Sequence, residues 1–483
     1  MHDVPLLIGG QSRPAANGAT YERRNPVTDA PVSRAPAATP DDADAAVQAA
    51  AEAFPAWAAL PPGERRRRLL KAADLMDQHT DAFIRIGVAE TGAMPNWIGF
   101  NVMLAANMLR EAAAMTTQID GSVIPSDVPG NFAMAVRQPC GVVLGIAPWN
   151  APVILGTRAL AMPLACGNTV VLKASEACPG VHRLIGTVLH EAGLGDGVVN
   201  VVTNAPADAA QVVERLIAHP AVRRVNFTGS THVGRIIAQH AARHLKPALL
   251  ELGGKAPVVV LDDADLDAVV DAVAFGAFFN QGQICMSTER VIADRKIADA
   301  LVDKLAAKAR TLRAGDPTDP TSVLGAMVSI DAAKRVQALV EDARAHGAAL
   351  PVGLHVDGAI VQPAIVDGVT PAMRLYREES FGPVVTVACV DGDEDAIRLA
   401  NDSEYGLSAS VFSRDVSRAM QVAQRIESGI CHINGPTVHD EAQMPFGGVK
   451  SSGYGRFGGK ASIAEFTELR WVTLQNTPRH YPI

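Results

Sequence analysis

The stretch GVVLGIAPWN (residues 141–150) is a short apolar run that ends in residues typical of a turn or a helix start. The segments that follow it, such as 181–192 and 206–219, carry apolar residues at helical spacing instead. Strands that alternate with helices predict βαβ units and a parallel sheet buried on both faces, so the expected fold class is α/β. Three more runs of the same kind are NTVVLKASE (168–176), GVVNVVT (197–203) and VRRVNFTGS (222–230).

A second series of this kind begins further along the chain. APVVVLDDADLDAVVDAVAFGAFFN (256–280) predicts a strand, an Asp-rich helix start and a long helix to about residue 279. Nearer the N-terminus, residues 41–60 predict one helix, and a second is expected from Glu64. The end of the chain, residues 468–483, predicts an extended strand and a tail, and such a strand can pair with the sheet edge of another subunit.

Composition excludes several classes of function. The 483 residues are 48% hydrophobic and carry a net charge of -8, which argues against nucleic acid or an anionic membrane as the main partner. The basic run 65–68 is expected to be the solvated face of its helix. Proline, asparagine and arginine interrupt the most apolar segment, 141–166, so no membrane helix is expected. No signal peptide pattern opens the chain, and a soluble, cytoplasmic protein is expected.

The cysteines give a further exclusion. Six of them are spread over the chain without a CxxC pair or a matching histidine pair. Reduced thiols are therefore expected, with no disulfide scaffold and no metal site.

Two βα crossings have features of a nucleotide site. In VNFTGSTHVG, a strand is followed by Gly229, Ser230 and Gly234, which open the next helix; backbone amides at a helix N-terminus can bind a phosphate. A plain helix cap explains this motif equally well. Lys173 and Glu176 follow another strand, where a carboxylate can accept hydrogen bonds from ribose hydroxyls and repel a 2′-phosphate. An ordinary surface ion pair is the alternative.

Three residues are candidates for catalysis. Cys285 stands in NQGQICMSTER ahead of a predicted strand, although most buried free cysteines are inert. Glu251 lies in an apolar stretch, where desolvation would bring a carboxylate closer to neutral titration, unless backbone amides satisfy it. Asn150 follows a strand, where its amide can donate to a developing oxyanion or cap the next helix. No one of the three decides the function alone.

Taken together, six motifs resemble the aldehyde dehydrogenase superfamily in order and spacing, over nearly the whole chain. Longer segments, including FNQGQICMSTER (279–290), resemble the bacterial vanillin dehydrogenases, with salicylaldehyde and benzaldehyde dehydrogenases next. The six motifs are PWN (148–150), FTGS (227–230), ELGGK (251–255), GQICMS (282–287), EESFGP (378–383) and PFGGVKSSG (445–453).

The resemblance implies oxidation of an aromatic aldehyde to its acid. Cys285 would attack the aldehyde to give a thiohemiacetal, whose oxyanion the Asn150 amide and the Cys285 N–H would hold. Glu251 would activate the water that hydrolyses the resulting thioester. The implied cofactor is NAD, with NADP possible. The implied cofactor-binding residues are Lys173 and Glu176 at the adenosine ribose, Ser230 at a phosphate between Gly229 and Gly234, Glu379 and Phe381 at the nicotinamide end, and Ile146 and Trp149 along the same passage.

The family fold implies three parts and a homodimer or homotetramer. An NAD-binding domain would take residues 1–120 and 141–252, and a catalytic domain residues 253–452. A small oligomerisation arm with the tail would take residues 121–140 and 453–483.

The substrate tunnel is expected to have aromatic walls. Trp97 and Phe100 lie on a predicted helix that borders the aldehyde tunnel in the family. Arg158 lies eight residues beyond Asn150 and is expected on nearly the same helix face. One donor among aromatic walls would suit a benzaldehyde with a hydroxyl or methoxy group. The alternatives are that Trp97 is core and that Arg158 makes a structural ion pair. Further tunnel candidates are Ile284, Met286, Val438 and Phe446.

Other functions stay open at this point. An aliphatic aldehyde or succinate semialdehyde is the alternative substrate, and the latter would need a cationic anchor, for which Arg158 is the candidate. A relative without catalytic activity is the alternative outside enzymes. It would be expected to have lost Cys285, Glu251 or Asn150, and all three are present.

Overall fold

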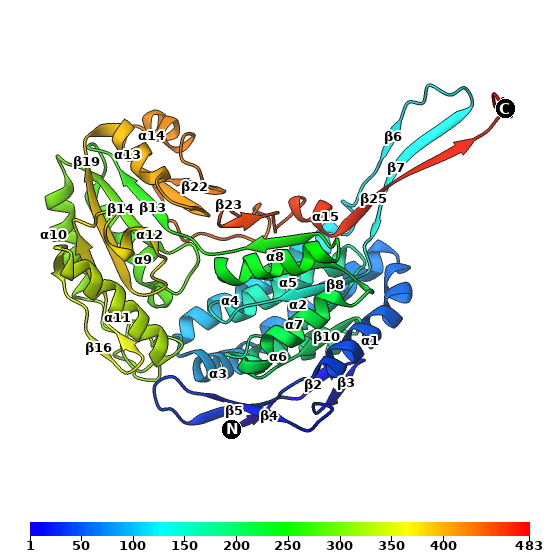
Figure 1. The fold of residues 1–483 in the computed structure, drawn as a ribbon, viewed down its shortest axis with the longest axis horizontal. Helices are drawn as coiled ribbons and strands as arrows, with labels where there is room; N and C mark the ends of the chain where they lie inside the picture. The colour runs from blue at the N-terminus through cyan, green and yellow to red at the C-terminus, as the bar shows by residue number, and fades with distance from the viewer.

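The computed structural model describes residues 1–483 and contains two large sheets and a projecting arm (Figure 1). The first sheet has eight strands, and its five central strands run parallel. Every residue of β8 and β9 is buried, as expected for strands covered on both faces. In sheet order the strands are β24 (Gly453–Tyr454), β12 (Ala248–Glu251), β11 (Val222–Thr228), β8 (Val142–Ile146), β9 (Thr169–Lys173), β10 (Val199–Val202), β2 (Leu6–Ile8) and β3 (Gln11–Arg13).

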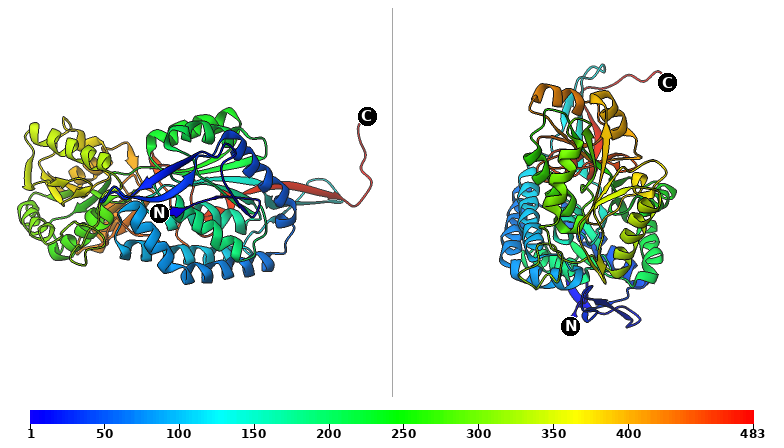
Figure 2. Two further views of the ribbon diagram at one scale, coloured as in Figure 1. Left: turned by 90° about the horizontal axis from the view of Figure 1, so that it is seen from below. Right: turned by 90° about the vertical axis from the view of Figure 1, so that its left-hand side faces the viewer.

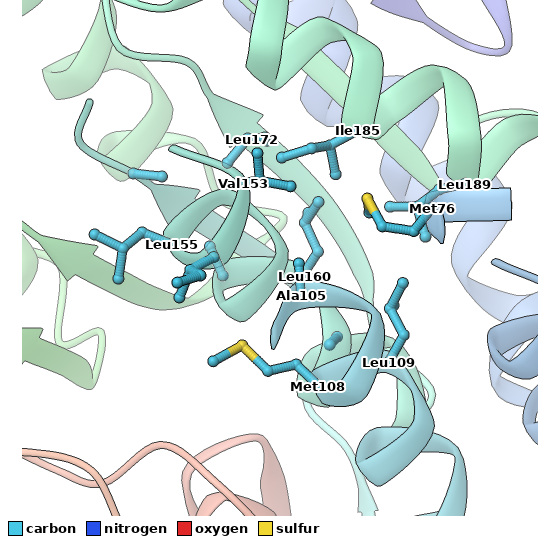
Figure 3. Packing of buried hydrophobic residues seen from close by; sticks show 14 of the residues in the cluster. Met76, Ala105, Met108, Leu109, Val153, Leu155, Leu160, Leu172, Ile185 and Leu189 are labelled. Atoms are coloured by element: carbon cyan, nitrogen blue, oxygen red, sulfur yellow. The ribbon is translucent and has the colours of Figure 1, made fainter. Parts of the chain in front are cut away.

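Helices cover both faces of this sheet (Figure 2). Helix α5 (Pro152–Ala165) is buried along its whole length, because α4 (Pro95–Met115), α6 (Pro179–Glu191) and the sheet surround it. This burial explains why its sequence is apolar on all sides. Figure 3 shows Leu160 of α5 among Met76, Leu109 and Leu189. The other elements here are α2 (Pro62–Gln78) and α3 (Thr80–Thr91) on the α5 side, and α1 (Pro40–Ala58), α7 (Ala209–Ala218) and α8 (Thr231–Arg243) on the opposite face.

The second sheet has seven strands, six of them parallel and one antiparallel at the edge. In order they are β15 (Ala349–Val352), β18 (Ala364–Asp367), β19 (Val384–Val390), β14 (Thr288–Asp294), β13 (Ala256–Val260), β21 (Ser408–Phe412) and β22 (Ile430–Ile433). Its helices are α9 (Leu266–Phe278), α10 (Ala298–Ala309), α11 (Ile330–Ala345), α12 (Arg374–Arg377), α13 (Gly392–Asn401) and α14 (Val416–Ala423).

The arm projects from the body and carries the C-terminus at its far end (Figure 1). It consists of β6 (Ser122–Ile124), β7 (Asn131–Pro139) and β25 (Thr467–Gln475), all antiparallel. One boundary expected from the sequence is wrong: β24 pairs with β12 in the first sheet, so residues 453–454 do not belong to the arm. A separate three-stranded sheet, β1 (His2–Asp3), β5 (Pro31–Pro36) and β4 (Thr20–Arg24), lies at the N-terminal end.

The α/β class and the main helices are confirmed. The predicted helices 41–60 and 181–192 correspond to α1 and α6, and α9 starts at the Asp265 cap. The basic run of α2 is only partly solvated. Arg65 is 7% exposed and donates hydrogen bonds to the carbonyl oxygens of Leu60 (2.5 Å) and Ala165 (3.2 Å), so it joins α2 to the end of α5. No helix is both long and apolar enough to cross a bilayer.

Candidate active site

The three catalytic candidates meet where the parallel strands of the first sheet end. Glu251 is the last residue of β12 and pairs with Thr228, the last residue of β11. Asn150 follows the neighbouring β8, whose Ile146 pairs with Phe227. Cys285 comes from the other half of the molecule, between the 3₁₀ turn Phe279–Gly282 and β14. Ligands of open α/β sheets bind at this edge.

Burial controls the protonation of Glu251 and Cys285. The Glu251 side chain is buried, and neither of its carboxyl oxygens has a hydrogen-bond partner. Desolvation raises the pKa of Glu251 to about 7. Burial, followed by the nearby Glu251 carboxylate, raises the pKa of the Cys285 thiol well above its ordinary value. Without substrate, the proton of the Cys285–Glu251 pair therefore stays on the sulfur, next to a carboxyl group that titrates near neutrality.

The chain around Asn150 and Cys285 leaves donors free. One N–H of the Asn150 amide donates to the Gln283 carbonyl at 3.1 Å, and an amide nitrogen carries two. The backbone N–H of Cys285 makes no hydrogen bond within the protein. Asn150 is not a helix cap, because Ala151 is the N-cap of α5 and makes no side-chain cap bond. That structural alternative for Asn150 is therefore wrong.

Other side chains fix the position of Asn150. Its backbone carbonyl accepts hydrogen bonds from the Trp97 indole N–H (2.9 Å) and the Asn280 amide (3.0 Å). Asn280 and Gln281 both have left-handed backbone conformations (φ 48° and 56°), which turn the chain sharply before Cys285. Because asparagine tolerates this region better than most residues, the NQG sequence suits the turn.

Two cavities meet at Cys285 and Asn150, and both residues line each of them. The first cavity, of about 340 Å³, contains most of the charged and hydroxyl-bearing side chains and is called the polar cavity below. The second, of about 410 Å³, is mainly apolar. A molecule in either cavity can therefore approach the same thiol. The polar cavity is lined also by Pro148, Trp149, Thr228, Gly229, Ser230, Glu251, Leu252, Gly253, Arg335, Glu379 and Phe381.

A buried carboxylate holds the far wall of the polar cavity. Glu289 accepts hydrogen bonds from the backbone N–H groups of Ser380 (2.7 Å) and Phe381 (3.2 Å), and it pairs with Lys255 at 2.8 Å. These contacts hold Phe381 in a left-handed conformation (φ 49°), with its ring edge-on to Trp149 at 5.7 Å.

Glu379 lies in the same wall. Its carboxylate accepts a hydrogen bond from the Gly254 N–H at 2.9 Å, and burial raises its pKa to about 8. Arg335 donates to the backbone carbonyls of Glu379 (2.7 Å) and Ser380 (2.9 Å). A Cβ at position 253 would lie 2.7 Å from the Glu379 carboxylate, so only glycine leaves this side chain in place.

Lys173 and Glu176 lie at the end of the adjacent strand, outside the cavity lining. They form an ion pair, and Glu176 also accepts a hydrogen bond from Asn204 at 2.8 Å. Burial opposes ionisation of Glu176, but the charge and hydrogen bond of Lys173 outweigh it and lower the pKa of the carboxyl group. Ile146 is buried in the core and is not among the residues that line the cavity, so its place along the cofactor passage stays a prediction.

The glycine-containing turn after β11 opens α8 as predicted. Ser230 is the N-cap of α8, and its side chain accepts a hydrogen bond from the Val233 N–H at 3.3 Å. Gly229 and Ser230 line the polar cavity at this helix N-terminus. Ser230 therefore both caps α8 and lines the polar cavity.

All seven tunnel candidates line the apolar cavity, together with Asn150 and Cys285. Trp97 stacks on Phe100 at 5.8 Å and meets Phe279 edge-on at 5.1 Å. The seven are Trp97, Phe100, Arg158, Ile284, Met286, Val438 and Phe446; the remaining lining residues are Ala151, Ile154, Leu155, Phe275, Phe279, Pro436, His439 and Asp440.

Arg158 is both a lining residue and a member of an ion pair. Its guanidinium pairs with Asp440 and lies 4.2 Å from the centre of the Phe446 ring. The structural ion pair considered for Arg158 is thus present. Arg158 lies within α5, whereas Asn150 precedes that helix. The two residues therefore do not share a helix face, contrary to the expectation from the sequence.

A sequence profile of the aldehyde dehydrogenase family matches residues 13–472. The chain belongs to the aldehyde dehydrogenase family. It is 73% identical to a vanillin dehydrogenase of Pseudomonas fluorescens, over the full length of both chains. A crystal structure of a salicylaldehyde dehydrogenase from Pseudomonas putida, complexed with salicylaldehyde, is 47% identical and superposes with a TM-score of 0.98 over 100% of both chains. A point mutant of betaine aldehyde dehydrogenase from Staphylococcus aureus, solved with NAD+, is 30% identical with a TM-score of 0.94, covering 99% of this chain and 97% of that one.

Several residues of this aldehyde dehydrogenase site were missed from the sequence. Phe275 and Phe279 lie four residues apart in and just after α9, and they stack at 5.0 Å, a spacing that could have signalled them. Arg335 and Asp440 gave no such signal. Each acts through contacts with segments distant in the sequence.

Proposed function

We propose that this aldehyde dehydrogenase oxidises aromatic aldehydes to carboxylic acids with a nicotinamide dinucleotide as hydride acceptor. The observation that carries the proposal is the position of Cys285 at the junction of a polar and an apolar cavity. One cavity suits the dinucleotide and the other suits an aromatic ring, so the two would meet at the thiol.

The polar cavity and the adjacent strand end together have residues that could hold a dinucleotide. A phosphate would be held at the N-terminus of α8 by Ser230 beside Gly229, where backbone amides are free to donate. A Cβ at position 229 would lie 2.5 Å from the tip of the Phe227 ring, so a larger residue would displace that ring. We assign the adenosine ribose to Lys173 and Glu176, and the nicotinamide end to Glu379, Phe381 and Trp149. When bound there, the dinucleotide supplies a hydride acceptor next to Cys285.

The reaction would begin with proton transfer from the Cys285 thiol to Glu251. The sulfur then attacks the carbonyl carbon of the aldehyde and forms a thiohemiacetal. The new oxyanion accepts hydrogen bonds from the free N–H of the Asn150 amide and from the backbone N–H of Cys285. One such donor contributes about 2.7–4 kcal/mol to transition-state stabilisation in acyl transfer.

Oxidation of the thiohemiacetal leaves an acyl thioester on Cys285, and Glu251 would then act a second time. Glu251 first releases to solvent the proton that it took from the thiol. Its carboxylate then takes a proton from water, the resulting hydroxide attacks the thioester carbon, the C–S bond breaks, and the proton on Glu251 passes to the leaving sulfur. The carboxylic acid leaves and the thiol is restored. A carboxyl group with a pKa of about 7 suits both proton transfers at neutral pH.

The apolar cavity and the relatives support an aromatic substrate. Its walls contain five aromatic rings (Trp97, Phe100, Phe275, Phe279 and Phe446) and one buried ion pair. Vanillin, a hydroxy- and methoxy-substituted benzaldehyde, is the first substrate we propose, with salicylaldehyde and benzaldehyde as alternatives. Succinate semialdehyde fits less well, because Asp440 already neutralises the charge of Arg158.

We propose NAD as the preferred cofactor, with NADP possible, because the ionised Glu176 would repel a 2′-phosphate. We also propose a homodimer or homotetramer held through the arm, and a cytoplasmic location. Neither nucleic acid nor a membrane is part of the proposal.

The test is NADH formation by the purified protein. We expect kcat/KM for vanillin, salicylaldehyde and benzaldehyde to exceed the values for acetaldehyde and succinate semialdehyde. A higher value for a short or acidic aldehyde would contradict the aromatic substrate. It would leave the Cys285 chemistry in place.

A further inference from the structure

One carboxylate oxygen in the apolar cavity has no partner. The Asp440 side chain is 10% exposed and lines the cavity. Its Oδ2 accepts a hydrogen bond from Arg158, whereas its Oδ1 is buried and makes no hydrogen bond. A buried charged oxygen without a donor is costly, and nearly all such oxygens in folded proteins are satisfied. An unpaired acceptor in a cavity wall therefore points to a donor that the ligand brings.

The surroundings of Asp440 hold this oxygen in place. Arg158 makes its only side-chain hydrogen bond to Asp440, and its guanidinium stacks on Phe446 at 4.2 Å and lies 5.8 Å from Phe457. Both rings are buried, so the arginine cannot easily move away. The ion pair orients Asp440 and leaves its second oxygen without a partner in the wall of a mainly apolar cavity.

We propose that Asp440 Oδ1 accepts a hydrogen bond from a ring hydroxyl of the substrate and selects phenolic aldehydes over ring ethers and unsubstituted rings. This inference rests on the proposed function and names the substrate class of the same site. A phenol provides one O–H donor on an apolar ring, which matches one acceptor in an aromatic cavity. A methoxy group has no donor and would leave the carboxylate unsatisfied.

The position of Arg158 in α5 indicates which ring hydroxyl of the substrate would bind Asp440. Arg158 lies six residues after the start of α5 at Pro152, which corresponds to about 9 Å along the helix axis. Asn150 and the reacting thiol lie at the start of that helix. The Arg158–Asp440 pair therefore lies toward the distal end of the cavity, and the hydroxyl opposite the aldehyde group is the one assigned to it.

The experiment compares 4-hydroxybenzaldehyde with 4-methoxybenzaldehyde in three proteins: the natural sequence, Asp440→Asn and the control Glu441→Gln. Glu441 carries the same charge in the same loop, pairs with His439 and does not line the apolar cavity. For the natural sequence, we expect kcat/KM for the hydroxy compound to exceed that for the methoxy compound about tenfold or more. Asp440→Asn should bring the ratio close to one or reverse it, because the amide can place its NH₂ donor in the cavity. Glu441→Gln should keep the ratio.

The outcomes separate this inference from the proposed function. If no aldehyde yields NADH with the natural sequence, the proposed function itself fails. If both aldehydes are oxidised with equal kcat/KM, or if Asp440→Asn keeps the preference, the role of Asp440 is overturned. A preference confined to 2-hydroxybenzaldehyde would place the acceptor beside the thiol and would also overturn it. Should Asp440→Asn fail to fold with Arg158 unpaired, the double variant Arg158→Gln/Asp440→Asn removes both charges and must likewise lose the preference.

Discussion

Glu251 and Cys285 illustrate how burial and one neighbouring group set chemistry at the scale of single residues. A carboxylate in water would be too weak a base at neutral pH to take a proton from a thiol or from water. With both oxygens buried and without partners, Glu251 instead has a pKa of about 7. The raised pKa of Cys285 means that, without this base, only a small fraction of the thiol ionises at neutral pH.

The pH dependence of turnover follows from this arrangement. Glu251 acts as a base, so its deprotonated form is the active one, and kcat should rise as pH increases through about 7. Glu251→Gln should lower kcat by about 10²–10⁴-fold and remove that rise. Steady-state kcat between pH 5.5 and 9 checks both. If kcat of Glu251→Gln showed the same inflection near pH 7 as kcat of the natural sequence, the titrating group would be one other than Glu251.

Glu176 provides the second prediction at this scale. The ionised carboxylate near the assigned ribose site should disfavour the 2′-phosphate of NADP. Glu176→Gln should therefore lower the ratio of kcat/KM for NAD to that for NADP about tenfold or more, since like charges in contact cost several kcal/mol. Glu214→Gln, on the exposed side of α7, is the matched control and should leave the ratio unchanged. An unchanged ratio in Glu176→Gln would remove Glu176 from cofactor choice.

At the scale of elements, the site depends on how closely α8 approaches the first sheet. A Cβ at position 234 would lie 2.3 Å from the Leu252 side chain, and Leu252 lines the polar cavity just after β12. Glycine at this position lets the N-terminal turn of α8 lie against the strand end. The helix thereby presents its first backbone amides to the cavity.

Gly234→Ala tests this close approach. The added methyl should push α8 or Leu252 away, raise KM for the dinucleotide several-fold and lower Tm. Gly63→Ala in α2 is the control, since a Cβ there meets nothing within 4 Å and alanine favours a helix. Dinucleotide titration and thermal unfolding give the two readouts. If Gly234→Ala binds the dinucleotide as well as Gly63→Ala does, the close approach of Gly234 to Leu252 does not contribute to dinucleotide binding.

Elements of this kind were predictable where local pattern determines them. The strands at 141–150 and 222–230, their helices and the residues at the strand ends follow from apolar periodicity and from turn residues. The family motifs supplied Ile284, Met286 and Phe446, and the helices and loop that border the tunnel in the family supplied the other four candidates; all seven line one cavity. Long-range contacts were not predictable. Arg65 looked solvated but donates a hydrogen bond to a carbonyl 100 residues away, and Asp440 lies in an irregular loop whose partner is on α5.

At the scale of the whole molecule, the arm leaves an apolar surface unpaired. Trp471 is 74% exposed, Leu469 61% and Val123 67%, all on the three strands that project from the body. A monomer rarely exposes such a surface on a sheet edge, and a second copy of the chain would cover it. This exposure supports the proposed homo-oligomer.

Trp471→Asp should dissociate that assembly. The charge would be buried without a partner at a subunit contact, so the variant should elute as a smaller species. Leu245→Asp is the control, because Leu245 is 92% exposed on the body and has a left-handed backbone that aspartate tolerates. Light scattering coupled to gel filtration measures both masses. A monomeric natural protein would show that the arm does not hold subunits together.

The central claim is that Cys285 carries the substrate as a thioester. The most direct measurement is peptide mass spectrometry of Glu251→Gln after it reacts with an aromatic aldehyde and NAD and is quenched in acid. The small thiolate fraction of the variant still acylates slowly, and the variant lacks the base that hydrolyses the thioester. We therefore expect an aroyl group to accumulate on Cys285 in amounts that match the NADH formed, and none in Cys285→Ala. An NADH burst without an acyl group, or an acyl group on any of the other five cysteines, would contradict the account.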